Sequence, residues 1–428
     1  MQEAQTFQFD RRGRLSAVLA QAGRGRRERP DISGPPVADR NTGSLESAGL
    51  FASLPQRSAY RLWLCALCLP VRVRTQTGDL CGEKSGMRHD RHPALSSVVV
   101  IGAGAWGTAL AVLLAKRHPR VSLWVYEGSL ASEMERAREN RVYLPGIRIP
   151  APVQPTSSLE KALTGQHLAI FVVPSHVFRT IVEQALPHLD PQALVVSATK
   201  GIEVQSLATM SRIMDELLPS GQRLRTAVLS GPSFAREVVA GRPTAIVAAA
   251  KDPEVARAVQ HAVSGDALRV YAGTDVLGVE LGGAVKNVIA IAAGVLDGLE
   301  LGPNARAALI TRGLAEMTRL GVAMGAQAAT FAGLAGMGDL ILTCTGDLSR
   351  NRRVGLGLAR GGRLDEILAN LGAVAEGVNT CRSTVALAER HGAEMPICRA
   401  VHRVLFEGQD PAEAVAQLMT RELRFEGD

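Results

Sequence analysis

The chain has 428 residues, of which 46% are hydrophobic and 21% charged, a composition typical of a globular protein of about two to three domains. Its net charge of +7 is concentrated in residues 1–86, which hold 13 Lys and Arg against 8 Asp and Glu, whereas the remainder holds 35 against 33. This distribution excludes a nucleic-acid footprint on the body of the protein, and six scattered cysteines fit a reducing cytoplasm rather than a disulfide scaffold.

Residues 1–94 show no sustained helical or strand period, and we expect them to form a disordered extension. Cys65 and Cys68 have no second ligand pair at zinc spacing, so no metal site is predicted. The apolar run 62–71 is too short to span a bilayer, and no transmembrane segment is predicted. Because Met87 begins the short segment that leads into the first predicted strand, residues 1–86 are interpreted as a dispensable tail or an over-extended start assignment.

An apolar strand at residues 98–101 runs through Gly102, Gly104 and Gly107 into an apolar helix. This is the G-x-G-x-x-G fingerprint of dinucleotide binding, in the strand–turn–helix context that gives it meaning. We expect Gly102 to permit the tight turn, Gly104 to let a pyrophosphate approach bare backbone, and Gly107 to let the helix pack closely on the strand. The N–H groups and positive dipole end of the helix would then face the phosphates.

Further apolar runs predict a doubly wound, mostly parallel sheet with helices on both faces, a Rossmann-type domain over residues 95–275. The predicted strands are 121–125, 167–173, 194–198, 226–229 and 244–250. The sequence from 276 carries no strand signal and predicts an all-helical domain over 276–428. Its predicted helices are 276–299, 305–325, 350–360, 380–391, 396–407 and 410–421.

The second predicted strand bears on the choice of cofactor, because it ends at Tyr126 and Glu127 with no Arg, Lys or His beside them. In a Rossmann unit an acidic residue about 20 positions past the glycines binds the adenosine ribose 2′-hydroxyl, while a basic residue accepts the 2′-phosphate of NADP. Glu127 therefore favours NAD.

Lys286 lies within a predicted helix that is apolar all round and therefore buried. Its neighbours Gly282 and Gly283 are small enough to admit a ligand against the backbone. Burial is costly for an unpaired lysine and lowers its pKa, which suits proton exchange near neutrality. The alternative is a purely structural pairing with a buried carboxylate, for example Glu280 or Asp339.

Two other segments favour anions. Ser349 is a predicted helix N-cap, which places Arg350 and Asn351 in a first turn where a phosphate would be stabilised. The alternative is a solvated basic helix start. Lys200 follows the fourth strand at the sheet edge where α/β proteins bind ligands, and residues 230–235 form a loop after the next strand.

Nine motifs in order resemble the bacterial NAD(P)-dependent glycerol-3-phosphate dehydrogenases from about residue 96 to near the C-terminus. They are GAGAWGTALA (102–111), YLPG (143–146), VPSH (173–176), ATKG (198–201), SGPSFA (230–235), GGAVKN (282–287), GMGDL (336–340), SRNRR (349–353) and EGV (376–378). The resemblance implies reversible hydride transfer between NADH or NADPH and dihydroxyacetone phosphate, giving sn-glycerol 3-phosphate for glycerophospholipid synthesis.

By this resemblance Lys286 is the catalytic proton acceptor and donor. The implied substrate residues are Lys200, Gly231, Ser233, Lys286, Asp339, Ser349, Arg350 and Asn351. The implied nucleotide contacts are Ala105, Trp106, Tyr143, Lys200, Ala235, Arg350, Val374 and Glu376, beside the three glycines, Tyr126 and Glu127. We expect a cytoplasmic enzyme with a small-molecule substrate that could assemble as a homodimer.

The chain departs from the family where Tyr126 and Glu127 stand, since members often carry His or Arg there. This puts NADPH preference in question, unless Arg136, Arg138 or Arg141 supplies the positive charge. Two alternative functions remain open. Another β-hydroxyacid-type dehydrogenase would not need the phosphate site at 349–353. A catalytically inactive nucleotide-sensing module would have lost the acid–base lysine.

Overall fold

The computed structural model describes residues 8–9, 15–16, 95, 97–372, 374–423 and 425. The chain divides into two compact units, Met1–Asp90 and Arg91–Asp428. In the first unit the described residues form β1 (Gln8–Phe9) and β2 (Leu15–Ser16), which pair antiparallel. The rest of the predicted extension 1–94, with Cys65 and Cys68, lies outside the described residues.

The second unit contains an eight-stranded sheet of order β12-β11-β10-β9-β8-β3-β4-β7. Its strands are β3 (Ser97–Ile101), β4 (Arg120–Trp124), β7 (Val153–Thr156), β8 (Leu168–Phe171), β9 (Leu194–Ser197), β10 (Thr226–Ser230), β11 (Thr244–Ala249) and β12 (Leu268–Gly273). Neighbouring strands are parallel except at β10–β11. The prediction of a mostly parallel sheet is therefore confirmed, and the six predicted strands lie within two residues of their observed bounds.

Two strands of this sheet escaped prediction, β7 and β12. Both are edge strands. β7 reads Val-Gln-Pro-Thr and contains a proline, while β12 alternates buried with exposed residues along its first half, so neither presents a continuous apolar run.

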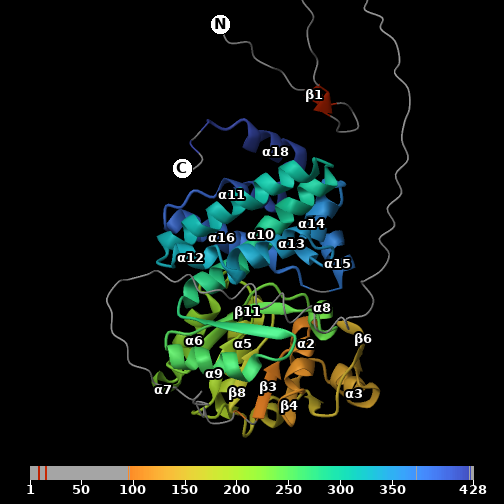
Figure 1. Cartoon of the computed structure of the whole chain (residues 1–428). Helices are drawn as coiled ribbons and strands as arrows, with labels where there is room; N and C mark the ends of the chain where they lie inside the picture. Colours follow the sequence, from red (N-terminus) through yellow and green to blue (C-terminus); the bar gives the residue numbers. More distant parts are fainter. Residues whose placement is uncertain are drawn as a thin grey trace, which may run out of the picture. The chain divides into compact units, whose positions relative to one another are not determined.

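Helices cover both faces of the sheet (Figure 1). They are α2 (Ala105–Leu114), α3 (Gly128–Ala137), α4 (Leu159–Leu163), α5 (Phe178–Ala185), α6 (Met210–Leu217), α7 (Ser220–Arg223), α8 (Ala235–Val239) and α9 (Pro253–Val263). Alternate residues of β3 point to opposite faces. Val98 and Val100 join one apolar core with Leu110 of α2, whereas Val99 joins the other with Phe178 of α5. A strand buried on both sides is what a covered parallel sheet requires.

The strand order reverses direction beside β3, because the chain continues from β3 to β4 and β7 on one side and then returns to β8 on the other side. Such a switch point is where open α/β sheets bind ligands, at the carboxyl ends of the strands. The segments that emerge at this edge carry Gly102 after β3, Ser175 after β8, Lys200 after β9 and Gly231 after β10.

The described residues after Thr274 form helices and no strand, as predicted. The elements are α10 (Val276–Gly298), α11 (Gly302–Ala323), α12 (Ala328–Phe331), the π-helical turn η3 (Leu334–Gly338), α13 (Asp339–Thr345), α14 (Arg350–Ala359), α15 (Leu364–Leu371), α16 (Glu376–Arg390), α17 (Pro396–Phe406) and α18 (Pro411–Met419). The turns α12 and η3 and the helices α13 and α15 were not predicted; the first three are short, and glycines interrupt this stretch at 333, 336 and 338.

α10 is the central helix of this part and is buried over most of its length. Glycines bring its backbone against α14: a Cβ on Gly294 would lie 1.9 Å from the carbonyl oxygen of Arg352, and one on Gly355 would lie 1.9 Å from that of Ile291. No side chain fits between the two helices at this crossing. The start of α14 is thereby fixed relative to the residues of α10.

Two described segments, Val276–Gly298 and Ala328–Thr345, are long and apolar enough to cross a membrane by length and composition alone. The first is the central helix α10, and 83% of its most apolar stretch is buried inside the fold, against 39% for the second. A buried core helix passes this test without a membrane. The absence of a membrane-spanning segment stays a prediction.

Candidate active site

The glycine turn between β3 and α2 has the geometry expected of each glycine. Gly102 has φ +114°, and a Cβ there would lie 2.5 Å from the carbonyl oxygen of Val172. A Cβ on Gly107 would lie 1.9 Å from the oxygen of Gly102, so helix and strand approach backbone to backbone. Gly104 has nothing within 4 Å and begins α2 without a side-chain cap. Ala105 and Trp106 form the first turn beside this open position.

A buried asparagine holds the neighbouring hairpin, β5 (Glu139–Asn140) and β6 (Leu144–Arg148), against the glycine turn. Asn140 donates from Nδ2 to the oxygen of Ala103 (2.7 Å) and to Oγ1 of Thr108 (2.8 Å), and its Oδ1 accepts from the N–H of Tyr143 (3.0 Å). Sequence reasoning missed Asn140, because its role depends on contacts more than 30 positions away.

Glu127 follows β4 and accepts a hydrogen bond from the hydroxyl of Tyr143 (3.1 Å). Burial raises the pKa of Tyr143, and the charge and hydrogen bond of Glu127 raise it further. Tyr126 is 75% exposed. The structure thus brings Glu127 and Tyr143 together beside the glycine turn.

The three arginines considered as alternative sources of positive charge have other surroundings. Arg138 donates to the backbone carbonyls of Ile149, Pro150 and Val153. Arg141 forms ion pairs with Glu133 (3.7 Å) and Glu139 (3.5 Å), and Arg136 lies exposed on α3.

Lys286 is buried on α10 and ion-paired. Its Nζ donates to Oδ1 of Asp339 (2.5 Å) and to Oγ1 of Thr343 (2.8 Å). The other oxygen of Asp339 accepts from Nζ of Lys200 (2.6 Å), which also donates to the oxygen of Gly231 (3.0 Å). The buried carboxylate of Asp339 therefore joins Lys200, at the carboxyl ends of the strands, to Lys286 of the helical part.

Burial lowers the pKa of Lys286, the charge of Asp339 opposes this and the charge of Lys200 adds to it, and the net result is a pKa of about 7. Such an amine exchanges a proton near neutral pH. Of the two carboxylates considered as partners, Asp339 is the one that pairs. Glu280 instead accepts from the backbone N–H (2.7 Å) and the hydroxyl of Ser211.

One expectation about the surroundings of Lys286 is wrong, since Gly282 and Gly283 do not open space for a ligand. A Cβ on Gly282 would lie 2.6 Å from the carbonyl oxygen of Ala335, and one on Gly283 would lie 2.5 Å from Oγ of Ser230. The two glycines let η3 and β10 approach α10 closely. The neighbouring elements fill the volume that small residues leave.

The start of α14 has the predicted cap, because Oγ of Ser349 accepts from the N–H of Arg352 (3.2 Å). Asn351 is buried in the first turn and donates to Oδ1 of Asn287 (2.9 Å), while its own Oδ1 accepts from the N–H of Gly377 (2.9 Å). Asn351 therefore links α14 to the residue after Lys286 and to the start of α16. The side chain of Arg350 remains exposed.

Glu376 connects the start of α16 to the sheet edge. Its carboxylate accepts from the N–H (3.1 Å) and the hydroxyl (2.5 Å) of Ser175, and its charge acts on Arg350. Burial raises the pKa of Glu376, and the bonds from Ser175 oppose this.

The structure brings most of the predicted residues together. Lys200, Gly231, Asp339 and Lys286 share hydrogen bonds, and Ser233 joins them by donating to the oxygen of Gly231 (3.1 Å). Two other predicted residues, both nucleotide contacts, lie outside this hydrogen-bonded cluster. Ala235 begins α8, which packs against α2, and Val374 lies exposed two residues before Glu376.

Thr343, Ser175 and Asn287 were not predicted as site residues. Thr343 lies one helical turn after Asp339, so the i, i+4 spacing could have found it. Ser175 and Asn287 stand inside motifs already noted, but their partners are distant in sequence.

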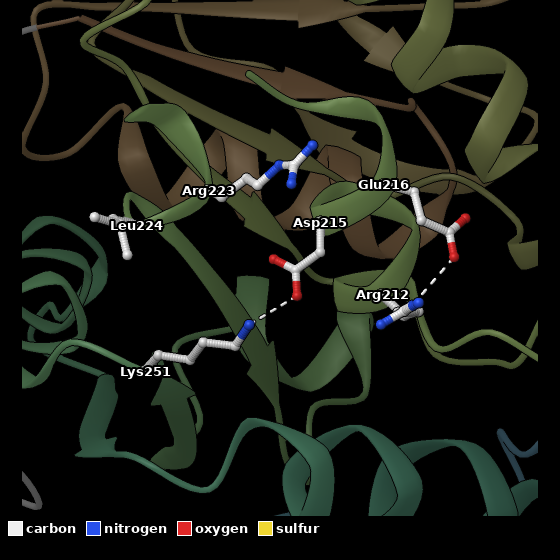
Figure 2. Close-up of a pocket in the computed structure, with 6 residues that line it drawn as sticks. All are labelled: Arg212, Asp215, Glu216, Arg223, Leu224 and Lys251. Carbon is white, nitrogen blue, oxygen red and sulfur yellow. Dashed lines mark hydrogen bonds and ion pairs between the residues drawn. The ribbon is translucent and has the colours of Figure 1, made fainter. Parts of the chain in front are cut away.

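A separate cavity of about 440 Å³ is lined by Arg212, Asp215, Glu216, Arg223, Leu224 and Lys251 (Figure 2). The ion pairs Lys251–Asp215 (2.7 Å) and Arg212–Glu216 (3.1 Å) join four of these residues. The cavity shares no residue with the cluster around Lys286.

Comparison with known proteins matches both parts of the second unit. The family model for the NAD-dependent glycerol-3-phosphate dehydrogenase N-terminus matches residues 97–256, and the model for the C-terminus of the same family matches residues 275–416. A glycerol-3-phosphate dehydrogenase (NAD(P)+) of Citrifermentans bemidjiense is 56% identical over 330 residues, covering 77% of this chain and 98% of the relative.

Solved structures of the same family also match this chain. Glycerol-3-phosphate dehydrogenase of Coxiella burnetii is 41% identical with a TM-score of 0.72, and the match covers 76% of this chain and 99% of that one. The enzyme of Saccharomyces cerevisiae is 27% identical with a TM-score of 0.65 over 76% and 99% of the two chains.

Proposed function

The chain belongs to the NAD-dependent glycerol-3-phosphate dehydrogenase family, and we propose that Lys286 exchanges the proton in the reaction of this family. That reaction is reversible hydride transfer between NAD(P)H and dihydroxyacetone phosphate, which gives sn-glycerol 3-phosphate. One observation supports the role of Lys286 above all: the only carboxylate it contacts within the described residues, Asp339, is shared with Lys200.

The residues present fit the cofactor. Gly104 leaves open space at the start of an uncapped helix, which suits a pyrophosphate. We infer that Gly102, Gly107, Ala105 and Trp106 shape this site. The remaining proposed nucleotide contacts are Tyr126, Glu127, Tyr143, Lys200, Ala235, Arg350, Val374 and Glu376. NAD(P)H, when bound, supplies the hydride.

In the reducing direction the Lys286 ammonium donates a proton to the substrate carbonyl oxygen as that oxygen gains negative charge. In the oxidising direction the neutral amine accepts the hydroxyl proton. Asp339 and Thr343 orient Nζ, and a pKa of about 7 lets the same group serve both directions. Water then restores the protonation state of Lys286.

The phosphate of the substrate would lie at the start of α14. Arg350 supplies a guanidinium there, and the first-turn N–H groups add the favourable end of the helix dipole. Ser349 and Asn351 hold this turn in place, while Lys200, Gly231 and Ser233 line the side nearer the sheet. A dehydrogenase for an unphosphorylated hydroxyacid would have no use for this arrangement.

We further propose that the enzyme prefers NADH to NADPH. Glu127 is held by Tyr143 at the position that binds a ribose 2′-hydroxyl, and its carboxylate would repel a 2′-phosphate. Arg138 and Arg141 are engaged elsewhere.

Steady-state kinetics with dihydroxyacetone phosphate and each cofactor tests both proposals. Turnover is expected with either cofactor, with kcat/KM up to about fivefold higher for NADH, the ratio that an exposed charge contact of up to about 1 kcal/mol produces. Glu127→Gln removes the negative charge and should bring kcat/KM for NADPH closer to that for NADH. Higher kcat/KM with NADPH would refute the selectivity, and no turnover with either cofactor would refute the function.

The wider role rests on the family reaction. We propose that the enzyme is cytoplasmic, supplies sn-glycerol 3-phosphate for glycerophospholipid synthesis and assembles as a homodimer. Rescue of a bacterial strain that requires added glycerol 3-phosphate tests the supply, and light scattering of the purified protein tests the dimer.

A further inference from the structure

The segment 201–209, called the strap below, runs from Lys200 to the start of α6 and docks on the helical part. Ile202 is buried within the apolar core of that part, and Leu207 packs against the same core. The hydroxyl of Ser383 on α16 donates to the oxygen of Ile202 (3.2 Å). The strap therefore follows a strand of the sheet along the chain, but its side chains pack against the helical part.

The strap carries backbone strain. Leu207 has φ +60°, in the left-handed region that non-glycine residues rarely adopt. Its N–H donates to the oxygen of Glu203, and Ile202 pairs with Thr209 in an isolated bridge. Strain of this kind persists only where surrounding contacts impose it. Packing of Leu207 on the helical core and the backbone bonds of Glu203 with Leu207 and Ala208 hold this turn.

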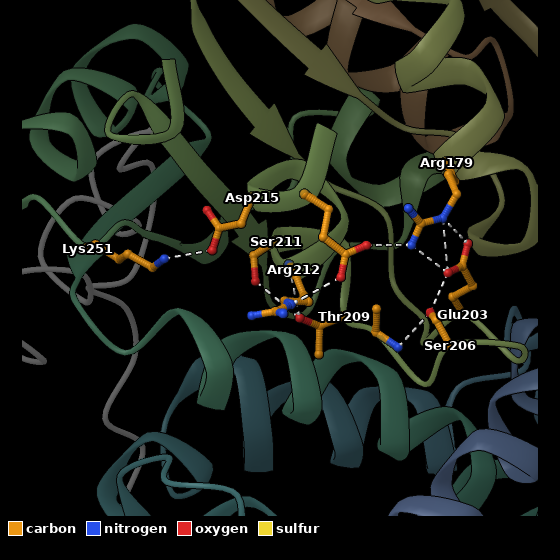
Figure 3. A network of polar contacts seen from close by, with 10 residues as sticks. Arg179, Glu203, Ser206, Thr209, Ser211, Arg212, Asp215 and Lys251 are labelled. Atoms are coloured by element: carbon orange, nitrogen blue, oxygen red, sulfur yellow. Dashed lines mark hydrogen bonds and ion pairs between the residues drawn. The ribbon is translucent and has the colours of Figure 1, made fainter. Parts of the chain in front are cut away.

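Glu203 is held by a bidentate ion pair with Arg179 of α5 (Figure 3). Nε of Arg179 lies 2.9 Å from Oε1 and Nη2 lies 2.8 Å from Oε2, and the hydroxyl of Ser206 donates to the same carboxylate. The same Nη2 lies 2.9 Å from Oε2 of Glu216. The side chain of Glu203 is 12% exposed, against 65% for Lys251 at the other edge of the network. A partly buried fork of this geometry is stronger than an exposed pair.

Each end of the strap leads to one of the two lysines at Asp339. Lys200 precedes it directly. At the far end Thr209 caps α6, and Ser211 in its first turn donates twice to Glu280, which lies on α10 six residues before Lys286. A displacement of the strap would therefore reach both lysines.

We propose that the Arg179–Glu203 ion pair is a positioning pair for catalysis, which fixes the strap so that Lys200 and Lys286 meet at Asp339. This inference rests on the proposed role of Lys286. Neither Arg179 nor Glu203 contacts the residues assigned to substrate or cofactor, so their effect passes through the strap.

Loss of the pair has a distinctive electrostatic consequence. The charged groups that act on Lys286 near neutral pH are Asp339 and Lys200, since burial raises the pKa of the neighbouring Cys344 thiol to about 12 and keeps it neutral. If Lys200 moves away from Asp339, its repulsion of the Lys286 ammonium is lost, and the Asp339 carboxylate pairs with Lys286 alone. Both changes favour the charged form and raise the pKa of Lys286. A generally loosened fold would let water reach Lys286 and raise its pKa as well, but it would also weaken NADH binding, so an unchanged Kd of NADH distinguishes the two cases.

Glu203→Gln tests the proposal, with Arg179→Lys as a second variant that keeps the charge but loses the fork. Arg212→Gln is the matched control, since it breaks the exposed Arg212–Glu216 pair of α6 but keeps the Arg179–Glu203 fork and the backbone N–H of residue 212 that donates to Thr209 of the strap. Each protein is measured for kcat, for the Kd of NADH, and for the dependence of kcat/KM on pH.

Glu203→Gln is expected to lower kcat for dihydroxyacetone phosphate roughly tenfold, as misplaced catalytic groups do. It should leave the Kd of NADH unchanged and move the apparent pKa of kcat/KM upward by roughly half a unit or more. Arg179→Lys should fall between this variant and the wild type, and Arg212→Gln should match the wild type.

Wild-type kcat and pH dependence in Glu203→Gln would overturn the proposal. So would a loss of kcat without the upward shift, or an equal loss of NADH binding, because both indicate a merely structural role. Full turnover in Lys286→Ala would instead refute the proposed function.

Discussion

The crossing of α10 and α14 offers a direct test of how the phosphate site is positioned. In Gly355→Ala the new methyl group would lie 1.9 Å from the oxygen of Ile291 and 2.8 Å from the N–H nitrogen of Val295. An ordinary carbon–oxygen contact is about 3.3 Å or longer, so α14 must withdraw from α10 by more than about 1 Å. Both neighbouring atoms belong to backbone and cannot rotate away.

Overpacking of this kind costs about 1–3 kcal/mol in the free energy of unfolding. A displacement near 1 Å at the substrate phosphate is expected to lower kcat/KM for dihydroxyacetone phosphate roughly 100-fold. The Kd of NADH should stay unchanged, because the glycine turn lies in the other part of the unit. Gly221→Ala is the matched control, since nothing lies within 4 Å of its Cβ position.

Urea denaturation, steady-state kinetics and NADH titration of the two variants give the three quantities. Wild-type stability and kcat/KM in Gly355→Ala would refute the close crossing and the positioning derived from it.

Three further outcomes follow from buried titratable and polar side chains. Because burial lowers the pKa of Lys286 to about 7, kcat/KM for reduction should fall as pH rises through 7 and kcat/KM for oxidation should rise, as two pH profiles would reveal; profiles flat near 7 would contradict this. Burial raises the pKa of Glu316 to about 7, so the folded state binds a proton that the unfolded state releases between about pH 4.5 and 7. Stability should therefore fall by up to about 3 kcal/mol as pH rises across that window, and Glu316→Gln, followed by urea denaturation at several pH values, should flatten the dependence. Asn351→Ala should raise the KM for dihydroxyacetone phosphate with little change in the Kd of NADH, since it releases α14 from Asn287 and Gly377; unchanged kinetics would show that this link is dispensable.

The local sequence pattern was sufficient to predict those elements whose structure depends on residues close together in the chain. The strand at 98–101, the glycine turn and the cap at Ser349 follow from side-chain size, backbone freedom and hydrogen-bonding groups within a few residues. β12 escaped because an edge strand alternates its exposure, and α13 because seven residues are too few to show a helical period.

The site was predictable in its charged groups but not in their partners. A lysine in an apolar helix indicated burial and a lowered pKa, yet the choice of Asp339 over Glu280 depends on how α13 and α6 pack on α10. Small residues at 282 and 283 suggested room for a ligand, whereas tertiary packing used that room for η3 and Ser230. Contacts across more than 50 residues decide such questions, and no local pattern encodes them.

The central claim is that the buried amine of Lys286 exchanges the proton with the substrate. Lys286→Ala, assayed for dihydroxyacetone phosphate reduction with NADH saturation established by titration, tests it most directly. The expected result is NADH binding with wild-type Kd and a kcat reduced by roughly 100-fold or more, the contribution of a positioned acid–base group. A kcat near the wild-type value in this variant would contradict the account.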